Sequence, residues 1–247
     1  MENSIKSVKK ALLALDFIIE KSEDREGVGL GEIAAHLKIN NSTARNILKT
    51  MEECGYLGRG PGRIYCPGAK CIDMSRNIFL KRLVTIAGDM ILEIARETGE
   101  SFVLASIKKA KRVVLFRASG DQVIRVDTER AESEDIYKLV TMRIFIAYMS
   151  RNELEFFISK NGFPNEKWNM IDNRVKLEAE LELLRMQGYA DDQTKHYHAF
   201  AVPIFGENEK IIASLGAYIP SFRATTEQSK KILELMINCS RKISKSL

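Results

Sequence analysis

The stretch GLGEIAAHLKINNSTARNILKTMEECGYL, residues 29–57, decides the fold. Its pattern predicts two short helices, near Gly31–Leu37 and from about Asn41 to Cys54, joined by a tight turn at 38–40. Gly55 stands where a glycine of positive φ commonly ends a helix. Two helices with so short a connection form a helix-turn-helix, a motif that places its second helix in the major groove of DNA.

The second of these helices has two unlike faces. At about 100° per residue, apolar side chains gather on one side and polar side chains on the other. The apolar residues are Ala44, Ile47, Leu48 and Met51. The polar residues, with Thr43 beside them, are Ser42, Arg45, Asn46 and Lys49. Because cations and amides read base edges, we expect Arg45 and Asn46 to contact bases and the other polar residues to hold phosphates. An ordinary solvated helix face is the alternative.

A short hairpin is expected after this helix. Tyr56–Arg59 and Arg63–Tyr65 resemble strands, and Gly60-Pro61-Gly62 between them suits a tight turn. Arg59 and Arg63 flank the turn, so we expect both to project from its tip toward a phosphate or a narrow minor groove. A solvated hairpin is the alternative.

A longer helix is expected before the helix-turn-helix. Its apolar side chains recur at steps of three and four, which predicts one buried stripe formed by Ile5, Val8, Leu12, Leu15 and Ile19. Ser4 is the expected N-cap, and the helix should end within the polar segment 21–27. Helix, helix-turn-helix and β-hairpin together predict a winged helix-turn-helix domain over residues 1–70.

Composition sets the outer bounds. A chain of 247 residues with 45% hydrophobic and 29% charged residues suits two globular domains. The net charge is +5, and an excess of basic residues between Lys38 and Arg63 favours an anionic partner. The uncharged run at 211–222 is too short to span a bilayer, so we expect a cytoplasmic protein without a membrane segment. Four cysteines without CxxC spacing argue against a zinc site or a disulfide framework.

The chain resembles the IclR-type transcriptional regulators of bacteria and archaea. The similar segments are SVKKALLALDFI (7–18), the stretch 29–57 quoted above, YCPGAKCIDM (65–74), ARETGESFVLASI (95–107), LLRMQGYADD (183–192), AFAVPIF (199–205) and IIASLGAYIPSFRAT (211–225). The resemblance implies a DNA-binding regulator whose C-terminal domain is GAF-like and binds an effector. Because one winged module touches few base pairs, a homodimer or a pair of dimers is expected.

The rest of the chain predicts an α+β domain with a mainly antiparallel sheet at 99–247, after a linker helix at 71–98. The expected strands are Ser101–Ile107, Arg112–Arg117, Ile124–Val126, Ala199–Phe205 and Ile211–Ile219. The expected helices are Lys138–Met149, Glu153–Lys160, Arg174–Gln187 and Thr226–Lys245. Ile232, Met236, Cys239 and Ile243 form the stripe that the last helix should bury.

The resemblance also implies a pocket for a small organic ligand, often a carboxylate or an aromatic acid. The positions that correspond to it are Leu139, Met142, Asp191, Asp192, Ala199, Gly216 and Tyr218. Several are more apolar than the family pattern: Met142 replaces a glycine, Leu139 a hydroxyl residue and Ala199 a cysteine. This favours an apolar or aromatic ligand over a small carboxylate. A pocket filled by its own side chains is the alternative.

Other functions have weaker support. His196 and His198 flank Tyr197 and could share a face of a strand, as two metal ligands would, although solvated histidines are the simpler interpretation. No motif of a hydrolase, metalloprotease, P-loop or dinucleotide-binding protein is present, so neither catalysis nor a cofactor is expected. A rival hypothesis is a metabolite-binding or protein-interaction module whose winged domain binds protein rather than DNA.

Overall fold

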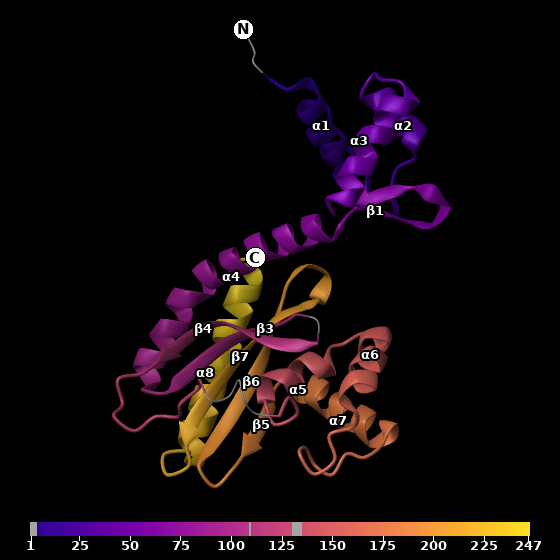
Figure 1. Cartoon of the computed structure of the whole chain (residues 1–247). Helices are drawn as coiled ribbons and strands as arrows, with labels where there is room; N and C mark the ends of the chain where they lie inside the picture. Colours follow the sequence, from indigo (N-terminus) through magenta and orange to yellow (C-terminus); the bar gives the residue numbers. More distant parts are fainter. Residues whose placement is uncertain (1–3, 109, 130–134) are drawn as a thin grey trace. The chain divides into compact units, whose positions relative to one another are not determined.

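The computed structural model describes residues 4–108, 110–129 and 135–247 (Figure 1). The chain divides into two compact units, Met1–Lys81 and Arg82–Leu247. Each unit has its own hydrophobic core. The two are therefore described separately.

The first unit is a winged helix-turn-helix, as predicted. Its elements are α1 (Lys6–Lys21), α2 (Leu30–His36), α3 (Asn41–Glu53), β1 (Leu57–Arg59), the 3-10 turn η1 (Pro61–Arg63), β2 (Tyr65–Pro67) and the start of α4 (Ala69–Thr98). Strands β1 and β2 pair antiparallel, with Arg59 opposite Tyr65. The α3 helix ends at the predicted place, since Cys54 is its C-cap and Gly55 has φ 78°.

The predicted buried stripe of α1 is wrong in most of its members. Ile5, Val8, Leu12 and Ile19 are exposed, whereas Ala14 and Ile18 are fully buried. The helix carries a second apolar run at steps of three and four, Ala11, Ala14 and Ile18, and this run packs in the core. Both runs have helical spacing, so periodicity alone could not show which of them faces inward.

The start of α1 also differs from the prediction. Its N-cap is Ile5, which makes no side-chain capping bond, and Ser4 lies outside the helix. Further along the helix, the Phe17 ring stacks on His36 of α2, with ring centroids 4.0 Å apart and an interplanar angle of 9°. This stacking links α1 to the helix-turn-helix.

The second unit is an α+β domain around an antiparallel sheet, as predicted. The sheet has five strands in the order β4-β3-β7-β6-β5. Its strands are β3 (Ser101–Lys108), β4 (Lys111–Ser119), β5 (Ala190–Gln193), β6 (Tyr197–Phe205) and β7 (Ile211–Pro220). The helices are the second part of α4, α5 (Val140–Ala147), α6 (Arg151–Asn161), α7 (Arg174–Gln187) and α8 (Thr226–Lys245), with a 3-10 turn, η3 (Glu207–Glu209), between β6 and β7.

The helix α7 has its predicted bounds, and α8 buries the predicted stripe from Ile232 to Ile243. The strand expected at 124–126 is absent among the described residues, where the chain forms bends and Val123 is 97% exposed. The short edge strand β5 was not predicted. It is only four residues long and carries two adjacent aspartates, a residue type that strands disfavour.

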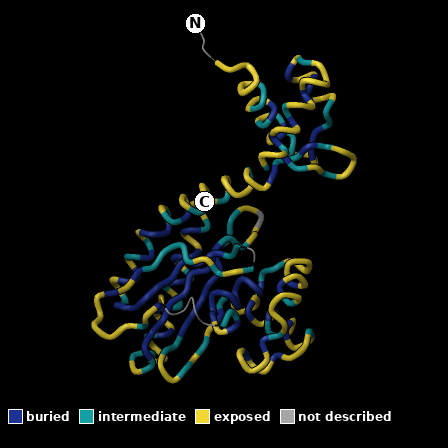
Figure 2. The backbone as a smooth tube through the Cα atoms, viewed as in Figure 1, coloured by how far each residue is buried: buried dark blue, intermediate teal, exposed yellow. Residues whose placement is uncertain are grey.

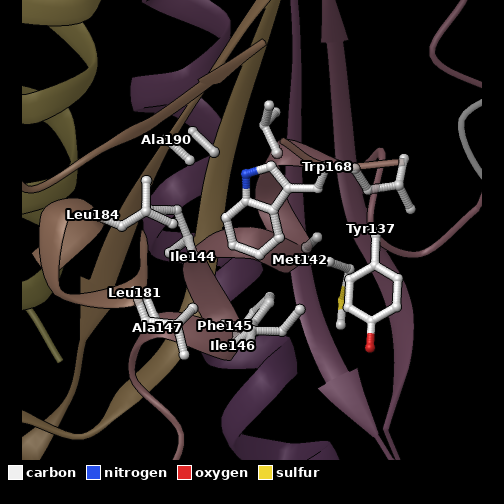
Figure 3. Packing of buried hydrophobic residues seen from close by; sticks show 14 of the residues in the cluster. Tyr137, Met142, Ile144, Phe145, Ile146, Ala147, Trp168, Leu181, Leu184 and Ala190 are labelled. Atoms are coloured by element: carbon white, nitrogen blue, oxygen red, sulfur yellow. The ribbon is translucent and has the colours of Figure 1, made fainter. Parts of the chain in front are cut away.

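The main core of this unit lies between one face of the sheet and helices α5 and α7. Every residue of α5 is buried, because this helix lies against β6 and β7 and also contacts α7. Figure 3 shows Trp168 within the cluster, with Met142 and Ile144 of α5 and Ala190 of β5 in view around it. Helix α8 packs on β6 and β7, and Ser240 Oγ donates to Pro203 O. In Figure 2 strands β3, β6 and β7 are largely buried, the edge strands β4 and β5 are mostly half-buried or exposed, and the outer faces of α6 and α7 are exposed.

Candidate nucleic-acid interface and effector domain

The α3 helix is anchored by a capped start and a buried apolar face. The Asn40 side chain accepts a hydrogen bond from the Thr43 backbone N–H at 2.8 Å, which satisfies one of the otherwise unbonded first-turn amides. Ala44 and Leu48 are fully buried, and Met51 is 8% exposed. The inner face of the helix is therefore fixed in the core of the first unit.

The opposite face of α3 is exposed. All the residues expected to contact DNA from this helix lie on that surface: Ser42, Thr43, Arg45, Asn46 and Lys49. Ser42 Oγ donates to Asn40 Oδ1 at 2.9 Å, so the N-cap also holds this hydroxyl. Lys49 Nζ lies 3.8 Å from Glu53 Oε1, while its side chain stays 72% exposed. The face thus presents two cations, an amide and hydroxyls to solvent.

The wing separates the two arginines that were expected to act together. Arg63 is exposed at the turn and has φ 62°, next to Gly62 with φ 74°. Arg59 instead lies against the helix, where its Nε is 3.1 Å from Glu52 Oε2. Its guanidinium also covers the Tyr65 ring, 4.1 Å from the centroid. The prediction that both arginines project from the tip is therefore wrong for Arg59.

Three residues that position this surface were not identified from the sequence. Asn40 was assigned to the turn, although an asparagine before a helix is a common N-cap signal. Glu52 and Tyr65 gave no local signal, because they meet Arg59 only after the hairpin folds against α3.

Most of the expected effector residues meet in one place. Leu139, Met142, Ala199 and Tyr218 belong to the same buried cluster between α5 and the sheet. Ala199 and Tyr218 face each other across β6 and β7. A Cβ on Gly216 would lie 2.8 Å from Thr141 Cγ2, so α5 lies directly on β7 there.

The two aspartates of the set have partners on different elements. Asp192 Oδ1 lies 3.1 Å from Nη1 of the buried Arg143, whereas Asp191 Oδ2 lies 3.4 Å from His198 Nε2. Arg143 Nε also donates to Tyr137 O at 2.8 Å, and the guanidinium lies 5.1 Å from the Trp168 ring centroid. Asp192 is thus the counter-charge of a buried arginine.

The phenol of Tyr137 belongs to the same region. Burial, and after it the carboxylate of Asp135, raises the pKa of Tyr137 to about 12. The hydroxyl therefore stays protonated at neutral pH, and it donates to Gly162 O. Its ring meets Phe157 edge-on, with centroids 5.8 Å apart.

The histidines do not form a recognisable metal centre. Within 4–108, 110–129 and 135–247, no three His, Cys, Asp or Glu side chains are grouped so that they could hold a metal ion. His198 Nδ1 lies 3.5 Å from Ser229 Oγ, whereas His196 is exposed in the bend just before β6. Among the described helices, none is both long enough and apolar enough to cross a membrane.

A winged helix-turn-helix with a cationic outer helix, followed by an α+β domain, defines a class of two-domain DNA-binding regulators. Comparison with known protein families gives the same class. Residues 7–61 match the IclR helix-turn-helix domain, and residues 80–245 match the C-terminal domain of the bacterial transcriptional regulator IclR.

Relatives extend over nearly the whole chain. The transcriptional regulator KdgR of Dickeya chrysanthemi is 22% identical, over 96% of this chain and 79% of its own. The transcriptional repressor IclR of Escherichia coli is 20% identical, over 97% of this chain and 89% of its own. The crystal structure of Thermotoga maritima IclR is 26% identical, covers 99% of both chains and has a TM-score of 0.58. That of an IclR-family regulator from Rhodococcus is 17% identical, covers 99% of this chain and 95% of its own, and has a TM-score of 0.69.

The chain belongs to the IclR family of transcriptional regulators. It is a regulator with a DNA-binding helix-turn-helix domain, and its relatives are regulators rather than enzymes.

Proposed function

We propose that this regulator reads a specific DNA sequence as a homodimer or a dimer of dimers and responds to a small organic molecule. Residues 1–70 would bind DNA, 71–98 would link the domains, and 99–247 would bind the effector. The observation that carries the proposal is the exposed polar face of α3, opposite a buried apolar face. The proposal also assigns the protein to the cytoplasm, where its DNA would lie.

On this proposal α3 enters the major groove, with Arg45 and Asn46 on bases and Ser42, Thr43 and Lys49 on phosphates. Arg63 would reach the backbone or the minor groove from the wing, and Arg59 would contact a phosphate from the side of the wing nearest α3. Cations and an amide on one exposed face match phosphates and base edges, which favours DNA over the rival in which the winged domain binds protein.

Replacing Lys49 by alanine tests the phosphate contacts. Affinity should fall for every duplex alike, and the slope of log K against log[salt] should become shallower by about one, because one counterion fewer is released. The matched control is Lys195→Ala, an exposed lysine of the second unit that has no assigned contact. Gel shifts at several salt concentrations give both quantities, and an unchanged slope for Lys49→Ala would remove its assigned role.

The apolar stripe on α1 supports self-association. Ile5, Val8, Leu12 and Ile19 are 69%, 52%, 58% and 43% exposed. A row of large apolar side chains in water favours burial against a second copy. Two-fold related copies would also present two α3 helices to two half-sites.

The effector site proposed here is apolar. Leu139, Met142, Ala199 and Tyr218 offer hydrocarbon and an aromatic ring, which favour an aromatic or apolar ligand. An IclR homologue from Microbacterium hydrocarbonoxydans has been crystallised with 4-hydroxybenzoate; it is 18% identical, with a TM-score of 0.57. Aromatic acids are therefore the first probes, and binding would appear as a rise in Tm. If no probe raises the Tm, the close packing of α5 on Gly216 favours a pocket filled by its own side chains.

A further inference from the structure

The wing arginine Arg59 is held from two sides. Its Nε lies 3.2 and 3.1 Å from the two carboxylate oxygens of Glu52, in the last turn of α3. The Cζ atom of its guanidinium lies over the Tyr65 ring, 4.1 Å from the centroid. Both contacts with Glu52 are made by Nε. The two terminal nitrogens of the guanidinium, Nη1 and Nη2, take no part in them.

Both supports are themselves fixed. Tyr65 is 2% exposed and faces Arg59 across the β1–β2 ladder. Its backbone also pairs with Val28, whose N–H donates to Tyr65 O at 2.9 Å. The Glu52 side chain is 34% exposed, and it leaves the helix one turn after Leu48, which is fully buried. The Arg59 side chain, which is 42% exposed, is thus held by two residues that the fold itself keeps in place, Glu52 and Tyr65.

The charge of Glu52 requires an explanation if this surface binds DNA. A carboxylate near the duplex repels phosphates and by itself weakens binding. The same carboxylate can fix the direction of a neighbouring arginine, whose planar fork must be oriented to grip a phosphate with two nitrogens. The arginine side chain then loses its rotamer freedom when the protein folds, so this loss no longer weakens DNA binding.

We propose that Glu52 and Tyr65 are positioning residues for DNA binding, which hold Arg59 so that its terminal nitrogens form a prepared clamp for a backbone phosphate. This inference rests on the proposed DNA-binding function. On this inference Glu52 and Tyr65 strengthen DNA binding without having to touch the duplex. The inference also explains why Arg59 lies against α3 instead of at the wing tip.

The test compares Glu52→Gln with Glu52→Met. Both variants remove the same negative charge and keep a side chain of similar length, but only glutamine retains an oxygen that can accept the Arg59 Nε–H. Dissociation constants are measured for the full chain on a mixed-sequence duplex at several salt concentrations, because a phosphate contact does not depend on sequence. Equal Tm values for the two variants exclude a difference in folding.

The expected result is that Glu52→Gln binds about two- to tenfold more tightly than Glu52→Met, the range for immobilising one flexible side chain. In an Arg59→Ala background the difference should vanish, and the salt slope should become shallower by about one. Equal affinities of the two variants would overturn the inference alone, as would a difference that persists without Arg59. If the unsubstituted chain binds no duplex, the proposed DNA-binding function fails first and this inference with it.

Discussion

Leu48→Ala is expected to lower the free energy of unfolding of the first unit by about 2–5 kcal/mol. Leu48 has no exposed surface and lies in the cluster that joins α1, α2, α3 and the wing. Truncation removes buried hydrocarbon and leaves a cavity among neighbours that several elements hold in place. For a small unit this is a large part of its total stability.

The measurement has to report on the first unit alone. The single tryptophan, Trp168, lies in the second unit, so its fluorescence is a poor probe of α3. Hydrogen exchange of the α3 amides gives the opening free energy directly. Ile47→Ala is the matched control. The Ile47 side chain is next to Leu48 in the sequence but only half-buried, so its truncation should lower the free energy of unfolding by less. Equal protection of α3 in both variants would contradict the assigned inner face.

Asp192→Ala is expected to destabilise the second unit by about 3 kcal/mol, the low end for breaking a buried ion pair. The low end applies because the Asp192 side chain is 29% exposed, whereas that of Arg143 is only 5% exposed. Without its counter-charge, the guanidinium keeps its bond to Tyr137 O and its contact with Trp168 but remains buried. The remaining charge then opposes folding.

Trp168 fluorescence during urea unfolding measures this change, because the ring lies beside the guanidinium. Asp191→Ala is the control: the neighbouring carboxylate faces His198 and is 47% exposed, so its loss should change stability little. Arg143→Met should cost less than Asp192→Ala, since it removes the buried charge and leaves a carboxylate that water can reach. The opposite order would contradict the assigned role of the pair.

The parts of the fold that the sequence predicted well are those with strong local signals. The helix-turn-helix was recognised from its periodicity, its short turn and Gly55. The helices α7 and α8 were predicted with their bounds because apolar residues recur at helical spacing between clear end signals. Fold class followed from the grouping of strands and helices.

The errors have a common physical origin in tertiary contacts. The α1 helix has two apolar runs, and only packing against α2 and α3 selects the one that includes Ala14 and Ile18. Arg59 was expected to point away from the protein, yet Glu52 and Tyr65 hold it against α3. The edge strand β5 has weak strand propensity and exists because β6 pairs with it.

In the candidate sites, too, local sequence patterns predicted some residues, whereas others depend on tertiary contacts. The exposed face of α3 follows from helical geometry, so its residues could be chosen from the sequence. The supporting residues Asn40, Glu52 and Tyr65 act through contacts that periodicity does not encode. In the second unit, the resemblance chose positions that mostly meet at α5, but only the structure shows that Asp192 is bound to Arg143.

The most direct test of the central claim is the affinity of Arg45→Ala for a fragment selected from genomic DNA and for a mixed-sequence duplex, measured at one salt concentration. If α3 reads base edges through Arg45, binding to the selected fragment should weaken by about 1–3 kcal/mol, and discrimination should relax at one base pair. Binding to the mixed duplex should weaken less. An equal loss on both DNAs, or no loss on either, would contradict the claim that this face of α3 reads the sequence.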